Sequence, residues 1–103
     1  AQIGNHVIMT AGAKLAGVFT LPGFVHLGIN STVHQRKIIG EGAMIGMSSV
    51  VIEHVLPYAK MVGVPATQVG MNEVGIKRRA LSMETVRQLI KNFKPTDALI
   101  ERL

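Results

Sequence analysis

The sequence predicts a mainly β fold, a left-handed parallel β-helix of about three coils followed by a small α-helical region. Three observations support this. Aliphatic residues recur at every sixth position of the first half, small residues follow them, and an apolar stripe of helical spacing appears only near the C-terminus. The expected divisions are residues 1–56 for the coils, 57–70 for an exit loop and 71–103 for the helical region.

The six-residue repeat starts at Ile3 and continues to Val51. Its positions are all aliphatic or methionine: Ile3, Met9, Leu15, Leu21, Leu27, Val33, Ile39, Ile45 and Val51. This period fits neither an amphipathic helix nor simple strand alternation. It fits a triangular coil in which each hexad supplies one short strand and one turn, so that three hexads close a coil. The handedness rests on the repeat itself, because left-handed crossovers between parallel strands are otherwise rare.

The neighbouring columns agree with this interpretation. The residue after each aliphatic is mostly small, as a chain that rounds a corner requires, and several are glycine: Gly4, Gly28, Gly40 and Gly46. The residue two positions before each aliphatic is mostly small or apolar and should face inward with it. Successive coils would then stack by parallel strand pairing, and each would bury its apolar face against its neighbours.

Helices are expected after the coils. Residues 71–81 (MNEVGIKRRAL) predict a short helix, and Ser82 is a candidate N-cap of a second one, with Glu84 in its first turn. The second helix carries one apolar stripe: Val86, Leu89, Ile90 and Phe93. We expect Pro95 to end it, and a further helix over 97–103.

Composition excludes several classes of protein. The 103 residues contain no cysteine, which rules out disulfides and thiolate metal sites and favours a reducing compartment such as the cytoplasm. No apolar run reaches the roughly 18–20 residues of a membrane span. The net charge is +5, and seven of the eleven basic residues lie after residue 70, which suits an anionic partner. No basic stretch alternates with aromatic residues, so nucleic acid is not an expected partner.

Three segments resemble one known family: IGNHVIMTAGAKLAG, STVHQRKIIG and GVPATQVGMNEVGIKRR. They are similar to the C-terminal half of the acyl-carrier-protein-dependent UDP-N-acetylglucosamine O-acyltransferases, from about Ile3 to Arg79. Hexads alone would fit many acyl- and acetyltransferases, whereas the Val-His-Gln tripeptide and the Asn…Gly-x-Lys-Arg-Arg stretch are more specific. The sequence is thereby expected to be the C-terminal part of such an enzyme.

This resemblance implies a homotrimer in the cytoplasm, with active sites in the grooves between neighbouring β-helices. It implies acyl transfer from hydroxyacyl-acyl carrier protein to the 3-hydroxyl of UDP-N-acetylglucosamine, the first step of lipid A biosynthesis. The phosphopantetheine thioester of the carrier protein would be the acyl donor, and no further cofactor is implied.

The resemblance also implies substrate-binding roles for five residues. His34 and Gln35 would contact substrate in the groove between subunits. Asn72, Arg78 and Arg79 would hold the nucleotide end, because a guanidinium pairs well with a diphosphate. From the residues alone, the default explanation of these side chains is a solvated group at a coil corner or on a helix face.

Other positions define the acyl pocket and the departures from the family. Met47 would form the floor of the acyl pocket, where a large side chain favours a shorter acyl group, although Met also serves as simple packing. The family's His–Asp pair, whose His is the general base, would fall immediately before Ala1, so no catalytic residue is expected in this chain. Val18 stands where the family has a second His, and Val74 where it usually has Glu.

Two alternative functions stay open. One is a non-catalytic trimeric β-helix that acts as a binding module, or a degenerate homologue, which the missing base favours. The other is a different hexapeptide-repeat sugar acetyltransferase that uses coenzyme A, which the two specific motifs oppose. No metal site is expected, because His6, His26 and His54 show no ligand spacing.

Overall fold

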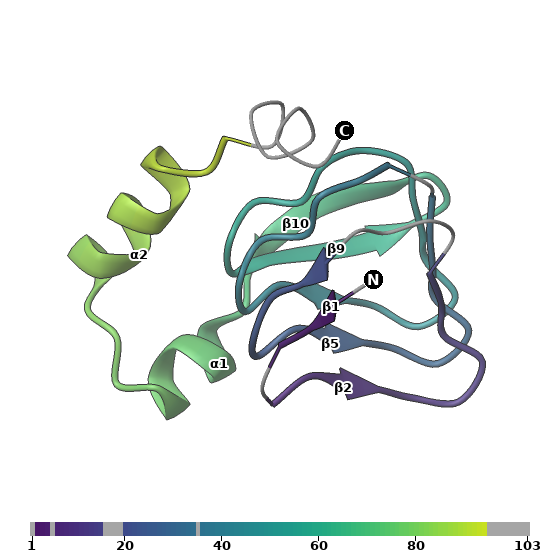
Figure 1. The fold of residues 1–103 in the computed structure, drawn as a ribbon, viewed down its shortest axis with the longest axis horizontal. Coiled ribbons are helices and arrows are strands. Elements are labelled where there is room, and N and C mark those ends of the chain that lie inside the picture. The colour runs from purple at the N-terminus through teal and green to yellow at the C-terminus, as the bar shows by residue number, and fades with distance from the viewer. Residues whose placement is uncertain (1, 5, 16–19, 35, 95–103) are drawn as a thin grey trace.

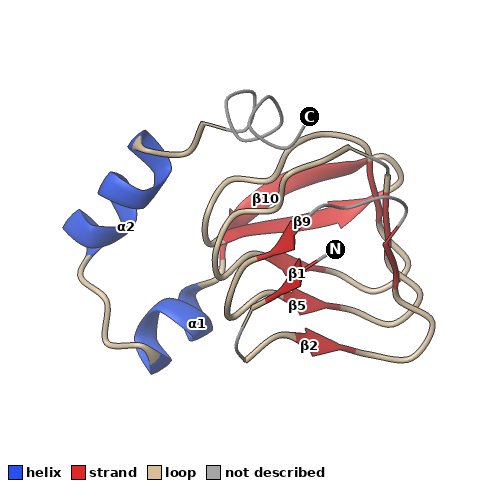
Figure 2. Ribbon diagram, viewed as in Figure 1, coloured by secondary structure: helices blue, strands red, loops and turns tan. Residues whose placement is uncertain are grey.

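The computed structural model describes residues 2–4, 6–15, 20–34 and 36–94 (Figure 1). Short strands form the β-helix, and two helices lie beside it (Figure 2). The elements are β1 (Gln2–Ile3), β2 (Ile8–Met9), β3 (Lys14–Leu15), β4 (Thr20–Leu21), β5 (His26–Leu27), β6 (Thr32–Val33), β7 (Met44–Ile45), β8 (Val50–Val51), β9 (Ala59–Gly63), β10 (Ala66–Met71), α1 (Glu73–Arg78) and α2 (Met83–Lys91).

Strand pairing confirms the hexad repeat. Strand β1 pairs in parallel with β4, β2 with β5 and β5 with β7, and β3 with β6 and β6 with β8. In each of these pairs the partners are 18 residues apart, as Leu27 and Ile45 are. Three hexads therefore close one coil, and the chain forms the expected left-handed β-helix of about three coils.

The inward columns form the core. The repeat positions from the second coil onward are almost fully buried: Leu21, Leu27, Val33, Ile39, Ile45 and Val51. In the second column Val25, Ser31, Ala43, Ser49 and Val55 are buried as well. Met9 of the first coil remains 43% exposed, because only one coil packs against it. Burial thus follows the stacking of each coil between two neighbours.

The expected exit loop at 57–70 is wrong. It contains β9 and β10, an antiparallel pair, and β9 joins β7 in parallel. Two prolines and a glycine suggested a loop, yet Gly63 is the last residue of β9, and Pro65 lies in the short connection between the two strands. Before it, the residues of β9 alternate between buried and exposed, as a half-buried strand requires.

Both helices begin close to where the sequence predicted. Asn72 caps α1 and Ser82 caps α2. The Oγ atom of Ser82 accepts a hydrogen bond from the backbone N–H of Thr85 at 3.1 Å. Helix α2 ends at Lys91, with Asn92 as its C-cap, four residues before Pro95 in the sequence. A second, smaller core joins the helices to the β-helix: Tyr58, Ile76 and Val86, with Met71, Leu81, Leu89 and Ile90 around them. The helix expected over 97–103 lies outside the described residues.

Candidate functional site

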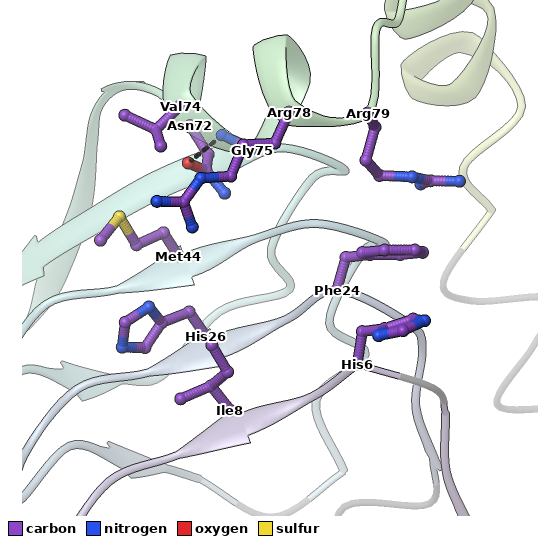
Figure 3. A pocket seen from close by; sticks show the side chains of 10 residues that line it. All are labelled: His6, Ile8, Phe24, His26, Met44, Asn72, Val74, Gly75, Arg78 and Arg79. Atoms are coloured by element: carbon purple, nitrogen blue, oxygen red, sulfur yellow. Dashed lines mark hydrogen bonds between the residues drawn. The ribbon is translucent and has the colours of Figure 1, made fainter.

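A groove of about 480 Å³ lies between the outer surface of the β-helix and helix α1 (Figure 3). Its floor consists of Ile8, His26 and Met44, the outward-facing residues of β2, β5 and β7. Strand pairing places these three residues in one column, since Ile8 pairs with His26 and His26 with Met44. The floor is therefore apolar apart from one imidazole.

Helix α1 forms the roof of the groove, and Asn72 fixes where it begins. The Oδ1 atom of Asn72 accepts from the backbone N–H of Gly75 at 3.0 Å, and its Nδ2 donates to the carbonyl oxygen of Gly42 at 2.8 Å. Only 9% of Asn72 is exposed. A Cβ on Gly75 would meet the Asn72 side chain at 2.5 Å, so glycine allows this cap to form. Asn72 is thus a buried link between the helix and the β-helix.

Arg78 projects from the same helix into the groove. Its side chain is exposed and extends over the floor, with the guanidinium near Met44 in the close view (Figure 3). A guanidinium above an apolar floor can bind a phosphate or diphosphate with paired hydrogen bonds. Val74 lies beside it on the roof and is 62% exposed, so the place where the family usually has Glu presents an apolar surface here.

Arg79 closes one end of the groove and is engaged with other side chains. Its Nη1 donates to Oε2 of Glu41 at 2.9 Å and to the hydroxyl of Tyr58. Its guanidinium carbon lies 3.8 Å from the centre of the Phe24 ring, whose other neighbour is His6, stacked with a centroid distance of 4.9 Å. Arg79 is therefore the centre of a contact network.

Ionisation in this network follows from these contacts. Burial opposes the charged form of Arg79, but hydrogen bonds to Tyr58 and Glu41 outweigh it, and the pKa of Arg79 rises above its ordinary value. Burial raises the pKa of the Tyr58 hydroxyl, although the hydrogen bond from Arg79 partly opposes this. The network thus holds a cationic Arg79 and a neutral Tyr58 at neutral pH.

His34 lies outside the groove, directly after β6. This residue is exposed, and its backbone N–H donates to the carbonyl oxygen of Val51 at 2.8 Å. On the next coil, Nδ1 of His54 accepts from the backbone N–H of Ile38 at 3.0 Å. Burial and then the charge of Lys37 lower the pKa of His54, which favours the neutral form that can accept this bond.

The groove brings together some of the expected site residues. Asn72, Arg78 and Arg79 all line it, whereas His34 and Met47 are not among its lining residues. Met47 is 71% exposed and lies between β7 and β8. Gln35 and Val18 lie outside the described residues.

Six lining residues were not expected in the site from the sequence: His6, Ile8, Phe24, His26, Met44 and Gly75. A signal for five of them was present, because residues 18 apart in a hexad repeat occupy the same place on successive coils. Ile8, His26 and Met44 share one such column, and His6 and Phe24 share another. Arg78, which extends over the column of Ile8, His26 and Met44, comes from beyond the repeat, and no periodic pattern connects it to that column.

The described residues contain neither a metal-binding cluster nor a membrane-spanning helix. Within residues 2–4, 6–15, 20–34 and 36–94, no group of three or more His, Asp or Glu side chains is placed to hold a metal ion. In the same part of the chain, neither helix has the length and apolar character that crossing a membrane requires.

Comparison with known proteins gives three informative relatives. No family model matches the chain. The acyl-(acyl-carrier-protein)–UDP-N-acetylglucosamine O-acyltransferase of Paracoccus denitrificans is 42% identical over 88 residues, which cover 85% of this chain and 34% of that protein. The chain thus spans about a third of the length of the curated relatives it matches.

Two solved structures of acyltransferases are also similar to this chain. The structure of LpxA from Acinetobacter baumannii is 29% identical with a TM-score of 0.61, and the match covers 86% of this chain and 34% of that one. Serine acetyltransferase of Neisseria gonorrhoeae is 32% identical with a TM-score of 0.62, over 66% of this chain and 30% of the other. The former match extends over the larger share of this chain.

Proposed function

Since the chain belongs to the acyl-(acyl-carrier-protein)–UDP-N-acetylglucosamine O-acyltransferase family and corresponds to the C-terminal part of its members, we propose that it supplies their nucleotide-sugar site. The reaction would transfer an acyl group from hydroxyacyl-acyl carrier protein to the 3-hydroxyl of UDP-N-acetylglucosamine. The cytoplasmic location expected from the cysteine-free composition is part of this proposal.

The observation that carries this proposal is the position of Arg78. Its exposed guanidinium projects from α1 over a groove with an apolar floor. A diphosphate would pair with this cation, and the uridine or the sugar would lie against Ile8 and Met44. The imidazole of His26 adds a polar contact for the same ligand.

The remaining proposed contacts require a second copy of the chain. His34 follows β6 and Met47 follows β7, and neither of them lines this groove, while Gln35 comes directly after His34 in the sequence. A homotrimer would place the corner of one copy opposite the groove of another. In that arrangement His34 and Gln35 would contact the substrate and Met47 would limit the length of the acyl group.

The chemical step is an attack of the sugar hydroxyl on the thioester carbonyl. A general base takes the hydroxyl proton, the C–S bond breaks, and the phosphopantetheine thiol leaves. The residues proposed here bind and orient the acceptor, and none of them is assigned the role of that base. Their contribution is to hold the hydroxyl where the thioester can reach it.

A non-catalytic binding module is the second candidate. Val74 favours it, because this residue is 62% exposed on the roof where the family usually offers a carboxylate to the nucleotide sugar. The module would bind UDP-N-acetylglucosamine or the carrier protein without turnover.

Calorimetry and a thioester assay test both candidates. We expect the protein to bind UDP-N-acetylglucosamine, and to bind UDP alone through the same diphosphate. Absence of binding to either nucleotide would remove the nucleotide-sugar site. Binding without thioester cleavage in a trimeric preparation, with hydroxyacyl-acyl carrier protein as donor, would favour the binding module.

A further inference from the structure

Helix α1 is held at both of its ends by one corner of the third coil. At its N-terminal end, Nδ2 of Asn72 donates to the carbonyl oxygen of Gly42 at 2.8 Å. At its C-terminal end, Nη1 of Arg79 donates to Oε2 of Glu41 at 2.9 Å. Because Glu41 and Gly42 are consecutive, this corner determines where the helix lies on the β-helix.

Two further residues, Tyr58 and Phe24, contact the guanidinium of Arg79. Tyr58 is fully buried and accepts a hydrogen bond from the same Nη1 atom. Phe24, from the second coil, lies under the guanidinium with 3.8 Å between the ring centre and the guanidinium carbon. The plane of the guanidinium thus rests on an aromatic ring while its edge donates to two oxygens, which is a geometry that lysine could not reproduce.

Arg78 gains its position from this arrangement. It is the last residue of α1, directly before the residue that is held, and its own side chain points into the groove (Figure 3). We propose that Arg79 is a positioning residue: its contacts with Glu41, Tyr58 and Phe24 fix α1 so that Arg78 reaches a bound diphosphate. The part that concerns the diphosphate rests on the proposed function.

A direct role for Arg79 makes the opposite prediction for Glu41. If Arg79 itself bound the diphosphate, the carboxylate of Glu41 would compete with the ligand for it. Removal of that negative charge would then free the guanidinium and strengthen nucleotide binding. If Arg79 positions Arg78, the same substitution loosens α1 and weakens binding. The sign of the effect therefore separates the two roles.

The test is the affinity for UDP-N-acetylglucosamine, measured by calorimetry well below the unfolding temperature. We expect Glu41→Gln to bind roughly threefold to tenfold more weakly than the unaltered protein, the loss of about one charged hydrogen bond at a partly exposed site. Glu53→Gln removes an equal charge from an exposed residue outside the groove lining and should stay within about twofold. Unchanged or tighter binding by Glu41→Gln would overturn the proposal.

Further variants guard against a general loss of folding. Tyr58→Phe keeps the buried ring and removes only the hydroxyl, and it should weaken binding in the same direction. Glu41→Gln combined with Arg79→Gln should be no weaker than Arg79→Gln alone, because both substitutions break the same contact. Additive losses would show that the two residues act separately, which contradicts the proposal.

Hydrogen exchange without ligand separates this proposal from the proposed function. The reporters are the backbone N–H groups of Ile76 and Arg79, which donate within the α1 region to the carbonyl oxygens of Asn72 and Gly75. Both should exchange faster in Glu41→Gln and in Arg79→Gln, and at the unaltered rate in Arg78→Gln. If the protein binds no nucleotide, the proposed function fails and exchange alone decides whether Arg79 holds α1. Unchanged exchange in Glu41→Gln would overturn the proposal.

Discussion

The Nδ1 atom of His54 accepts a hydrogen bond from the backbone N–H of Ile38 at 3.0 Å, and this bond joins two successive coils. Ile38, the donor of this bond, comes four residues after His34 in the sequence. Only an unprotonated Nδ1 can accept, so the bond exists in the neutral form of the imidazole.

A pH dependence follows from this bond. Burial, and then Lys37, lower the pKa of His54 in the folded protein below its ordinary value of 6.5. The unfolded chain therefore binds more protons between these two values, and stability rises with pH there. The contribution of His54 is complete above about pH 6.5 and is lost as the pH falls towards the lower pKa of the folded state.

Urea unfolding between pH 5 and 8 measures this effect. His54→Asn keeps an acceptor oxygen near the place of Nδ1 but cannot be protonated, so it should lose less stability on acidification than the unaltered protein. Every other residue is the same in the two proteins, so the difference between their profiles reports on His54. Identical pH profiles would show that His54 does not couple to folding.

Gly42 is a second position that should determine stability, because a side chain added there would meet the Tyr58 ring. Its φ is +68°, and a Cβ there would lie 2.2 Å from the Tyr58 ring. We expect Gly42→Ala to cost about 1–3 kcal/mol, from left-handed backbone strain and displacement of the ring.

Gly70→Ala is the matched control for Gly42→Ala. A Cβ on Gly70 meets no atom of the described residues within 4 Å. Its denaturation midpoint should change little, within about 0.5 kcal/mol. Equal losses from the two substitutions would contradict the role assigned to the Tyr58 contact.

Core substitutions should reveal the stacking of the coils. Leu27 is fully buried between two neighbouring coils, and Leu27→Ala should cost about 2–5 kcal/mol. Met9 occupies the equivalent column position but is 43% exposed, and Met9→Ala should cost roughly 1 kcal/mol or less. Denaturation midpoints at equal m-value provide the comparison. A larger cost at Met9 would contradict the order of burial described here.

Nucleotide binding should depend on Arg78 more than on its neighbour. Arg78→Ala should weaken UDP-N-acetylglucosamine binding by about tenfold or more, because a charged hydrogen bond to the diphosphate is lost. Lys77→Ala removes the same charge from an exposed residue that does not line the groove, and its effect should stay below about threefold. Calorimetry at fixed ionic strength measures the affinity of both variants. Equal losses of affinity would show that Arg78 contributes only its positive charge and makes no specific contact with the diphosphate.

The sequence predicted the coils because their cause is periodic and local. Each aliphatic residue of a hexad repeats the environment of the residue 18 positions earlier, so a pattern in one dimension specifies the stacking. The same reasoning failed at residues 57–70, where two prolines and a glycine outweighed the alternation within Ala59–Gly63. The helix cap at Ser82 was accessible because a cap and its partner lie within a few residues.

The candidate site was only partly accessible from the sequence. The resemblance pointed to Asn72, Arg78 and Arg79, and all three line the groove. It could not say what each of them contacts. Asn72 and Arg79 carried the same expected role as Arg78, yet Asn72 is a buried cap and Arg79 is paired with Glu41. Phe24 and His26 were missed because the hexad repeat places them in columns of the coil without showing which segment covers those columns.

The sequence by itself therefore determined the β-helix and its three-hexad coil, since each position repeats the same demand for a small or aliphatic side chain. Only the tertiary structure decided where α1 lies and which arginine faces the groove. The contacts responsible join Asn72 to Gly42, 30 residues away, and Arg79 to Glu41, 38 residues away. Such contacts form once the coils have brought distant segments together, and no local pattern in the chain specifies them.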